Sequence, residues 1–177
     1  MSEPDPDPCC GRPVEDKDSL RAEAGLDTAE HGILDIARFY FSSFAHPDSQ
    51  AWMAGLDTAQ ALFGDDGPRI AARVMDVLRA MRCARRSTFM FNAPTCPGCS
   101  RILTEHERRL IQGFAALRRG AMGQARVEAM MLCEGNPTGG LLDAMQALAD
   151  VLPGTQAPQY ARPPTQSERT GYAAIPR

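Results

Sequence analysis

Four of the six cysteines are the residues whose type and spacing point most directly to chemistry. Cys96 and Cys99 enclose a Pro-Gly dipeptide, and Cys83 and Cys133 lie on either side of this turn along the chain. Two thiolates three residues apart on a tight turn can chelate one ion, and Pro-Gly is a typical turn sequence. The sequence therefore predicts a metal site with Cys83, Cys96, Cys99 and Cys133 as ligands.

The turn from Cys96 to Cys99 resembles the knuckle of zinc ribbons, a likeness that covers these four residues only. Four thiolates suit structural Zn²⁺ or an iron–sulfur cluster. The turn favours zinc, whereas the helical surroundings and the 33 residues between Cys99 and Cys133 favour a [4Fe-4S] cluster. Two other interpretations stay open, since Cys83 and Cys133 suit a helical core and Cys96 with Cys99 could form a redox dithiol. His106 is an alternative fourth ligand.

The elements that must position these residues are all helical, so we expect an all-α fold. Apolar residues recur at helical spacing, and no alternating β pattern of useful length is present. Thr104 and Glu107 form a capping box of the form T-x-x-E, which predicts the start of one helix. In an up-down bundle the third helix ends, the fourth begins and the fifth ends at the same pole, so all four sulfurs would converge there. The predicted helices lie at about 30–44, 48–63, 68–85, 104–119, 121–133 and 138–152.

Composition divides the 177 residues into three parts. Residues 1–28 are rich in Pro, Asp and Glu and predict a disordered acidic leader. This leader contains Cys9 and Cys10, which are adjacent and therefore cannot easily chelate one tetrahedral ion. Residues 153–177 predict a disordered Pro-rich tail. The helical metal-binding domain, a single bundle of about six helices, is expected at 29–152.

Charge is distributed unevenly along the chain, whose net charge is -3. Residues 1–64 contain 12 acidic and 4 basic side chains, whereas residues 65–134 contain 12 arginines and 7 acidic side chains. The basic centre either neutralises the acidic part within the fold or faces a partner. We favour a protein partner that contacts Arg118 and Arg119. Aromatic residues are scarce in the basic segment, so nucleic-acid binding is possible but not favoured.

The sequence contains no signal for a membrane or for secretion. No apolar run approaches the roughly 18 residues that a membrane span needs. The start of the chain is acidic and Pro-rich, with neither the basic residues nor the apolar stretch of a secretory signal. The expected location is therefore the cytoplasm.

No motif assembles a nucleophile, a base and a residue that orients the base. Metalloprotease, phosphate-loop and hydrolase motifs are missing from the sequence. The sequence therefore favours a non-enzymatic regulatory or adaptor protein whose helical fold is held by a structural zinc ion. The alternatives are an iron–sulfur protein that senses redox state or transfers electrons, and an Arg-rich DNA-binding regulator.

Overall fold

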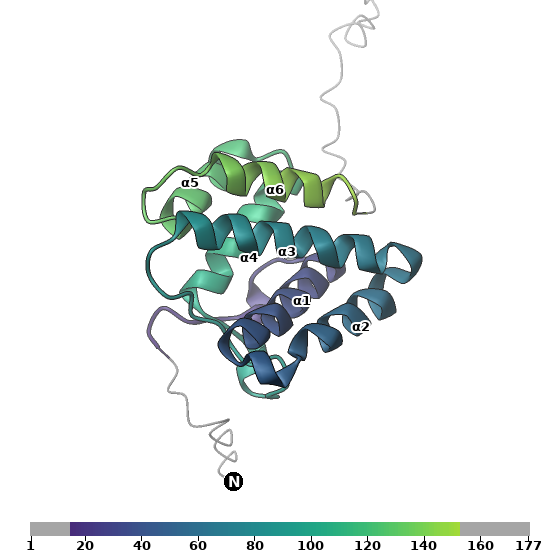
Figure 1. Ribbon diagram of the computed structural model, residues 1–177. Coiled ribbons are helices and arrows are strands. Elements are labelled where there is room, and N and C mark those ends of the chain that lie inside the picture. Colours follow the sequence, from purple (N-terminus) through teal and green to yellow (C-terminus); the bar gives the residue numbers. More distant parts are fainter. Residues whose placement is uncertain (1–14, 153–177) are drawn as a thin grey trace, which may run out of the picture.

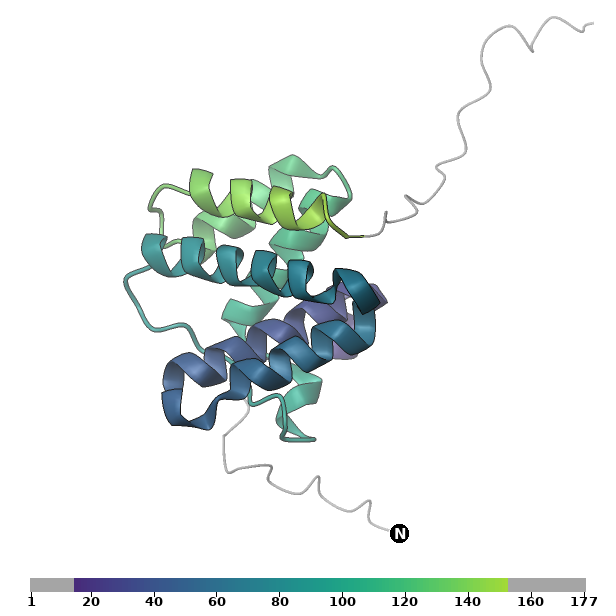
Figure 2. The same cartoon turned by 45° about the vertical axis from the view of Figure 1, so that its right-hand side comes forward.

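The computed structural model describes residues 15–152, which are mostly helical (Figures 1 and 2). This confirms the helical fold class. None of the helices in this range is both long and apolar enough to cross a membrane. The remainder of the predicted leader and the predicted tail, residues 1–14 and 153–177, lie outside the described residues. The helices are α1 (Thr28–Ala45), α2 (Ala51–Phe63), α3 (Gly67–Ala84), α4 (Glu105–Arg118), α5 (Met122–Leu132) and α6 (Gly139–Ala149).

Helix α3 occupies the middle of the fold. It lies between α6 on one side and the pair α1 and α2 on the other, and α4 crosses behind α3 to reach α5 (Figures 1 and 2). The approach of α2 to α3 requires a glycine at position 67, because a Cβ there would lie 2.7 Å from the carbonyl oxygen of Ala59. The chain then leaves α3 at Ala84 and runs through a long connection, residues 85–104, before α4 begins.

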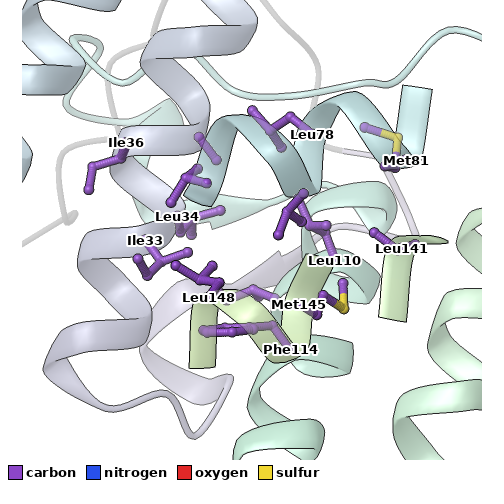
Figure 3. Close-up of a cluster of buried hydrophobic side chains, with 14 of the residues drawn as sticks. Ile33, Leu34, Ile36, Leu78, Met81, Leu110, Phe114, Leu141, Met145 and Leu148 are labelled. Atoms are coloured by element: carbon purple, nitrogen blue, oxygen red, sulfur yellow. The ribbon is translucent and has the colours of Figure 1, made fainter. Parts of the chain in front are cut away.

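The core forms where the apolar faces of α1, α3, α4 and α6 meet (Figure 3). Each helix contributes residues at helical spacing, as the sequence pattern predicts. Burying one such side chain stabilises the fold by about 1.5–3 kcal/mol relative to leaving it exposed. The labelled core residues of Figure 3 are Ile33, Leu34, Ile36, Leu78, Met81, Leu110, Phe114, Leu141, Met145 and Leu148.

Capping boxes begin both α1 and α4. Thr104 Oγ1 accepts a hydrogen bond from the Glu107 backbone N–H at 3.0 Å, and Glu107 Oε2 accepts one from the Thr104 N–H at 2.9 Å. The predicted start of α4 is thereby confirmed. Asp27 and Glu30 form the same arrangement at α1, where each carboxylate accepts from the other's backbone N–H.

Helix α2 differs most from its prediction. It begins at Ala51, after the 3-10 turn Pro47–Ser49, and packs on the outside of the bundle against α1 and α3. Ala59 is fully buried, whereas Trp52, which the same apolar spacing would place on the inward face, is 45% exposed. A helix at the edge of the bundle buries a narrow stripe, so Trp52 falls outside the core.

Residues 15–27, which the sequence places in the leader, carry short elements that pack on the domain. The strand β1 (Ser19–Leu20) pairs antiparallel with β2 (Ile102–Leu103), and Arg21 donates to both carboxylate oxygens of Asp35 at 2.7 and 2.8 Å. Lys17 Nζ lies 3.4 Å from Glu105 Oε2. Strands of two residues are too short to show the alternation that predicts a strand. Secondary structure therefore begins ahead of residue 29, the predicted start of the domain.

Candidate functional site at the pole of three helix ends

The end of α3, the start of α4 and the end of α5 meet at one pole, as the order of the helices predicts. Arg85, directly after α3, joins all three. Its Nη1 donates to the Leu132 carbonyl at 2.6 Å, and its Nη2 lies 3.1 Å from His106 Nε2. The Arg85 side chain is only 5% exposed. A buried guanidinium, which carries five N–H donors, therefore connects the three helix ends.

The four cysteines predicted as ligands differ in burial and in oxidation state. Cys83 is exposed on α3, Cys99 and Cys133 are buried, and Cys96 is disulfide-bonded. Within residues 15–152, no three His, Cys, Asp or Glu side chains are arranged to hold a metal ion. The zinc or [4Fe-4S] site formed by these four cysteines therefore stays a prediction.

Helical phase and burial explain where two of these sulfurs lie. The inward stripe of α3 runs through Val74, Leu78 and Met81, and Cys83 falls outside it. Cys133, just after α5, is fully buried. Burial raises the pKa of the Cys133 thiol, although the Arg85 guanidinium opposes this effect. A raised pKa favours the neutral thiol over the thiolate that binds metals.

Glu134 places a carboxylate at this pole. Its Oε2 accepts a hydrogen bond from the backbone N–H of Arg86 at 3.0 Å, and its Oε1 accepts one from the Ser87 hydroxyl. Arg85 Nη2 lies 3.2 Å from the same carboxylate. The hydrogen bond from Ser87, followed by that from the Arg86 N–H, lowers the pKa of Glu134 to about 2. The end of α5 is therefore attached to the end of α3 by an ionised carboxylate.

His106, the alternative metal ligand, accepts a hydrogen bond from the backbone and lies against the Arg85 guanidinium. The Met90 backbone N–H donates to its Nδ1 at 2.9 Å, and the Arg85 guanidinium faces its Nε2. Burial lowers the pKa of His106, and the positive charge of Arg85 lowers it further. The lowered pKa favours the neutral ring, which contacts the backbone of Met90 and the ring of Phe89 in the connection 85–104.

A buried ion pair holds the connection 85–104 against α1 and α4. Arg38 and Glu107 are both 0% exposed, with 2.7 Å between Arg38 Nε and Glu107 Oε1. Arg38 also donates to the carbonyls of Ser100 and Ile102 at 2.9 and 2.6 Å, and the Asn92 N–H donates to Glu107 Oε1 at 2.9 Å. We did not predict this pair from the sequence. A signal was present, because Arg38 lies on the apolar stripe of α1, one turn after Leu34, and a charged residue in such a position indicates a buried partner.

Arg118 and Arg119, predicted to face a partner, are used within the fold. Arg118 Nη1 lies 2.8 Å from Asp27 Oδ2 and 3.1 Å from Glu30 Oε1, and Arg119 Nη2 lies 2.7 Å from Glu30 Oε2. The Arg118 side chain is only 4% exposed. The interpretation that Arg118 is a partner-facing residue is therefore wrong, and here the basic centre neutralises the acidic part.

A hollow of about 360 Å³ opens beside the pole, between the ends of α1 and α3 and residues 85–91. Its apolar wall is aromatic: the ring of Phe41 stacks on Phe89 and Phe91, with centroids 4.3 and 5.4 Å apart. The guanidinium of Arg82 lies 4.3 Å above the centre of the Phe44 ring. Arg85 and Arg86 complete the cationic side of this hollow.

The hollow carries an excess of positive charge. Arg85 pairs with Glu134, but across residues 15–152 neither Arg82 nor Arg86 forms an ion pair. The carbonyl end of α3 contributes only about half a negative charge. Three guanidinium groups therefore carry more positive charge than Glu134 and the helix end neutralise, and the remaining charge favours the binding of an anion.

Comparison of the chain with protein-family profiles, curated proteins and solved structures finds no match.

Proposed function

We propose that this protein is a non-enzymatic regulatory or adaptor protein that binds an anionic group attached to an apolar body. The binding site is the hollow lined by Arg82, Arg86 and Phe44. One observation carries the proposal. Arg82 and Arg86, which form no ion pair within residues 15–152, lie beside a wall of stacked phenylalanine rings. Guanidinium groups bind carboxylates and phosphates through paired hydrogen bonds, and an aromatic wall binds the apolar part of a ligand.

Two features of the pole support a regulatory role. An anion drawn to the hollow would compete with Glu134 for Arg85, whose contacts join the ends of α3, α4 and α5. Binding could thus alter how these helix ends pack. The hydroxyl and imidazole groups of the pole have structural partners: the Ser87 hydroxyl donates to Glu134, and His106 Nδ1 accepts from a backbone N–H.

A fluorescent aromatic anion tests the proposal. Anilinonaphthalene sulfonate combines a sulfonate with fused rings, and its fluorescence rises in an apolar site. We expect the variant Arg82→Gln/Arg86→Gln to bind this probe at least about tenfold more weakly, since hydrogen bonds to charged groups contribute about 1.5–3 kcal/mol each. Arg79→Gln, an exposed arginine on the same helix, is the matched control and should bind like the wild type. Equal affinity in the double variant and the wild type would overturn the proposal.

The structural zinc ion remains a separate proposal, with the [4Fe-4S] cluster as its alternative. A centre formed by Cys83, Cys96, Cys99 and Cys133 would require reduction of the disulfide at Cys96 and a rearrangement of the connection 85–104. One zinc ion per chain in protein purified with a reductant, and a loss of several kcal/mol of stability in Cys99→Ser, would support it. Metal-free protein with an unchanged melting temperature in that variant would reject it.

A further inference from the structure

Three side chains that line the hollow offer hydrogen-bond donors that the fold does not use. Arg82 and Arg86 are exposed, and within residues 15–152 neither guanidinium forms a hydrogen bond or an ion pair. The exposed hydroxyl of Thr88 has no hydrogen-bond partner in the same range. Arg85 differs from them, because its guanidinium is already bonded within the pole. The available donors are therefore two guanidinium groups and one hydroxyl.

These donors suit a tetrahedral anion better than a planar one. Arg82 belongs to α3, whereas Arg86 and Thr88 belong to the connection 85–104, so the donors approach from two elements. A carboxylate presents two oxygens in one plane, which a single guanidinium can bind. A phosphate monoester presents three oxygens in different directions and carries a charge of about −1.5 to −2 at pH 7. No acidic side chain among the described residues lines the hollow. The hollow therefore favours a phosphate over a carboxylate.

The aromatic wall begins directly beside this positive charge. The guanidinium of Arg82 lies 4.3 Å from the centre of the Phe44 ring. The Phe44 ring meets the edge of Phe41 at 6.3 Å, and Phe41 stacks on Phe89 and Phe91. Aromatic rings gain energy from stacked and edge-to-face contacts with one another. Because the cationic and aromatic parts of the lining adjoin, a matching ligand carries its anion directly on a ring.

We infer that the ligand of the hollow is an aryl phosphate monoester, in which a phosphate oxygen is attached directly to an aromatic ring. This inference rests on the proposed function and names the class of ligand that the hollow takes. The volume of about 360 Å³ lies at the small end of the range of about 300–1,000 Å³ for ligand pockets, which suits one ring with one substituent. Two sources share this chemistry: a free aryl phosphate, and a phosphotyrosine side chain of a partner protein.

Displacement of anilinonaphthalene sulfonate from the full chain tests the class of ligand. Phenyl phosphate should bind at least about tenfold more tightly than benzoate, which has the same ring but a carboxylate. It should also bind at least about tenfold more tightly than acetyl-phosphoserine amide, whose phosphate has no ring. Adenosine monophosphate should bind more weakly than phenyl phosphate, because the ribose separates its ring from its phosphate. If any of the three comparison compounds binds as tightly as phenyl phosphate, the inference is wrong.

The variant Thr88→Val tests the third donor at nearly constant side-chain volume. Loss of the hydroxyl should weaken the binding of phenyl phosphate by about three- to tenfold and leave the binding of benzoate unchanged. Arg79→Gln, on the exposed side of α3, is the control and should bind both compounds like the wild type. Unchanged binding of phenyl phosphate in Thr88→Val, or an equal loss for both compounds, would contradict the assignment of a phosphate.

A peptide with phosphotyrosine between two glycines distinguishes the two sources. Peptide binding at least as tight as that of phenyl phosphate supports an aryl phosphate carried by a protein. Binding of phenyl phosphate without binding of the peptide supports a free aryl phosphate.

Failure of this inference differs from failure of the proposed function. If Arg82→Gln/Arg86→Gln weakens probe binding while phenyl phosphate binds no more tightly than benzoate, the hollow binds aromatic anions without a preference for phosphate. The inference is then wrong and the proposed function stands. Probe binding that is insensitive to the two arginines overturns the proposed function itself.

Discussion

The buried pair of Arg38 and Glu107 gives the sharpest prediction for stability. The change Arg38→Met keeps an unbranched side chain of similar length but removes the hydrogen bonds to Glu107 and to the carbonyls of Ser100 and Ile102. It leaves the fully buried Glu107 carboxylate without its counter-ion. Breaking a buried pair in this way costs about 3–5 kcal/mol. The melting temperature should fall by roughly 10 °C, because each kcal/mol corresponds to about 2–4 °C in a chain of this size.

Urea denaturation followed by circular dichroism measures this loss. Adding Glu107→Gln to Arg38→Met should recover part of the lost free energy of unfolding, since the amide carries no charge to leave buried. Arg79→Met, on the exposed side of α3, is the control and should change stability by no more than about 0.5 kcal/mol. A loss below about 1 kcal/mol in Arg38→Met, or no recovery in the double variant, would refute the argument that this pair holds the connection 85–104.

Two further changes test the charge network. The pKa of Glu134 lies at about 2, below its ordinary value of 4.5, so its contribution to stability is present above pH 4.5 and is lost as the pH falls toward 2. The melting temperature of Glu134→Gln should therefore depend less steeply on pH in that window than the melting temperature of the wild type. Parallel dependence of the two melting temperatures on pH would contradict the role of this carboxylate. Arg118→Met removes a partner of the fully buried Glu30 and should cost about 2–4 kcal/mol in urea denaturation, whereas the exposed control Arg126→Met should cost almost nothing. Equal stability of these two variants would contradict the claim that Arg118 forms a stabilising ion pair within the fold.

The helices and the pole were predictable because their signals are local. Helical spacing of apolar residues and the capping box of Thr104 and Glu107 place most helix boundaries within a few residues. The order of helix ends then predicts that α3, α4 and α5 meet at one pole, as the contacts of Arg85 show. Asp27, the N-cap of α1, carries the same kind of signal, but the helix was predicted to begin at about residue 30, two residues after its actual start at Thr28.

The chemistry of the pole was not predictable from spacing alone. The turn from Cys96 to Cys99 predicts a chelate, but the direction of each sulfur depends on the position of its residue around the helix axis and on the path of the connection 85–104. Cys83 falls outside the inward stripe of α3, and Cys133 is buried beside Arg85. The hollow depends on contacts distant in sequence, such as the stacking of Phe41 on Phe89. Local patterns do not encode such contacts.

The central claim is that an anionic, apolar molecule binds in the hollow of Arg82 and Arg86, and nuclear magnetic resonance tests it most directly. With anilinonaphthalene sulfonate bound to the reduced full chain, we predict nuclear Overhauser effects between the ring protons of the probe and those of Phe44 and Phe89. Shifts of the backbone amides should concentrate at residues 85–91. Overhauser effects confined to the exposed methionines of α5, Met130 and Met131, with unchanged amides at 85–91, would contradict the account.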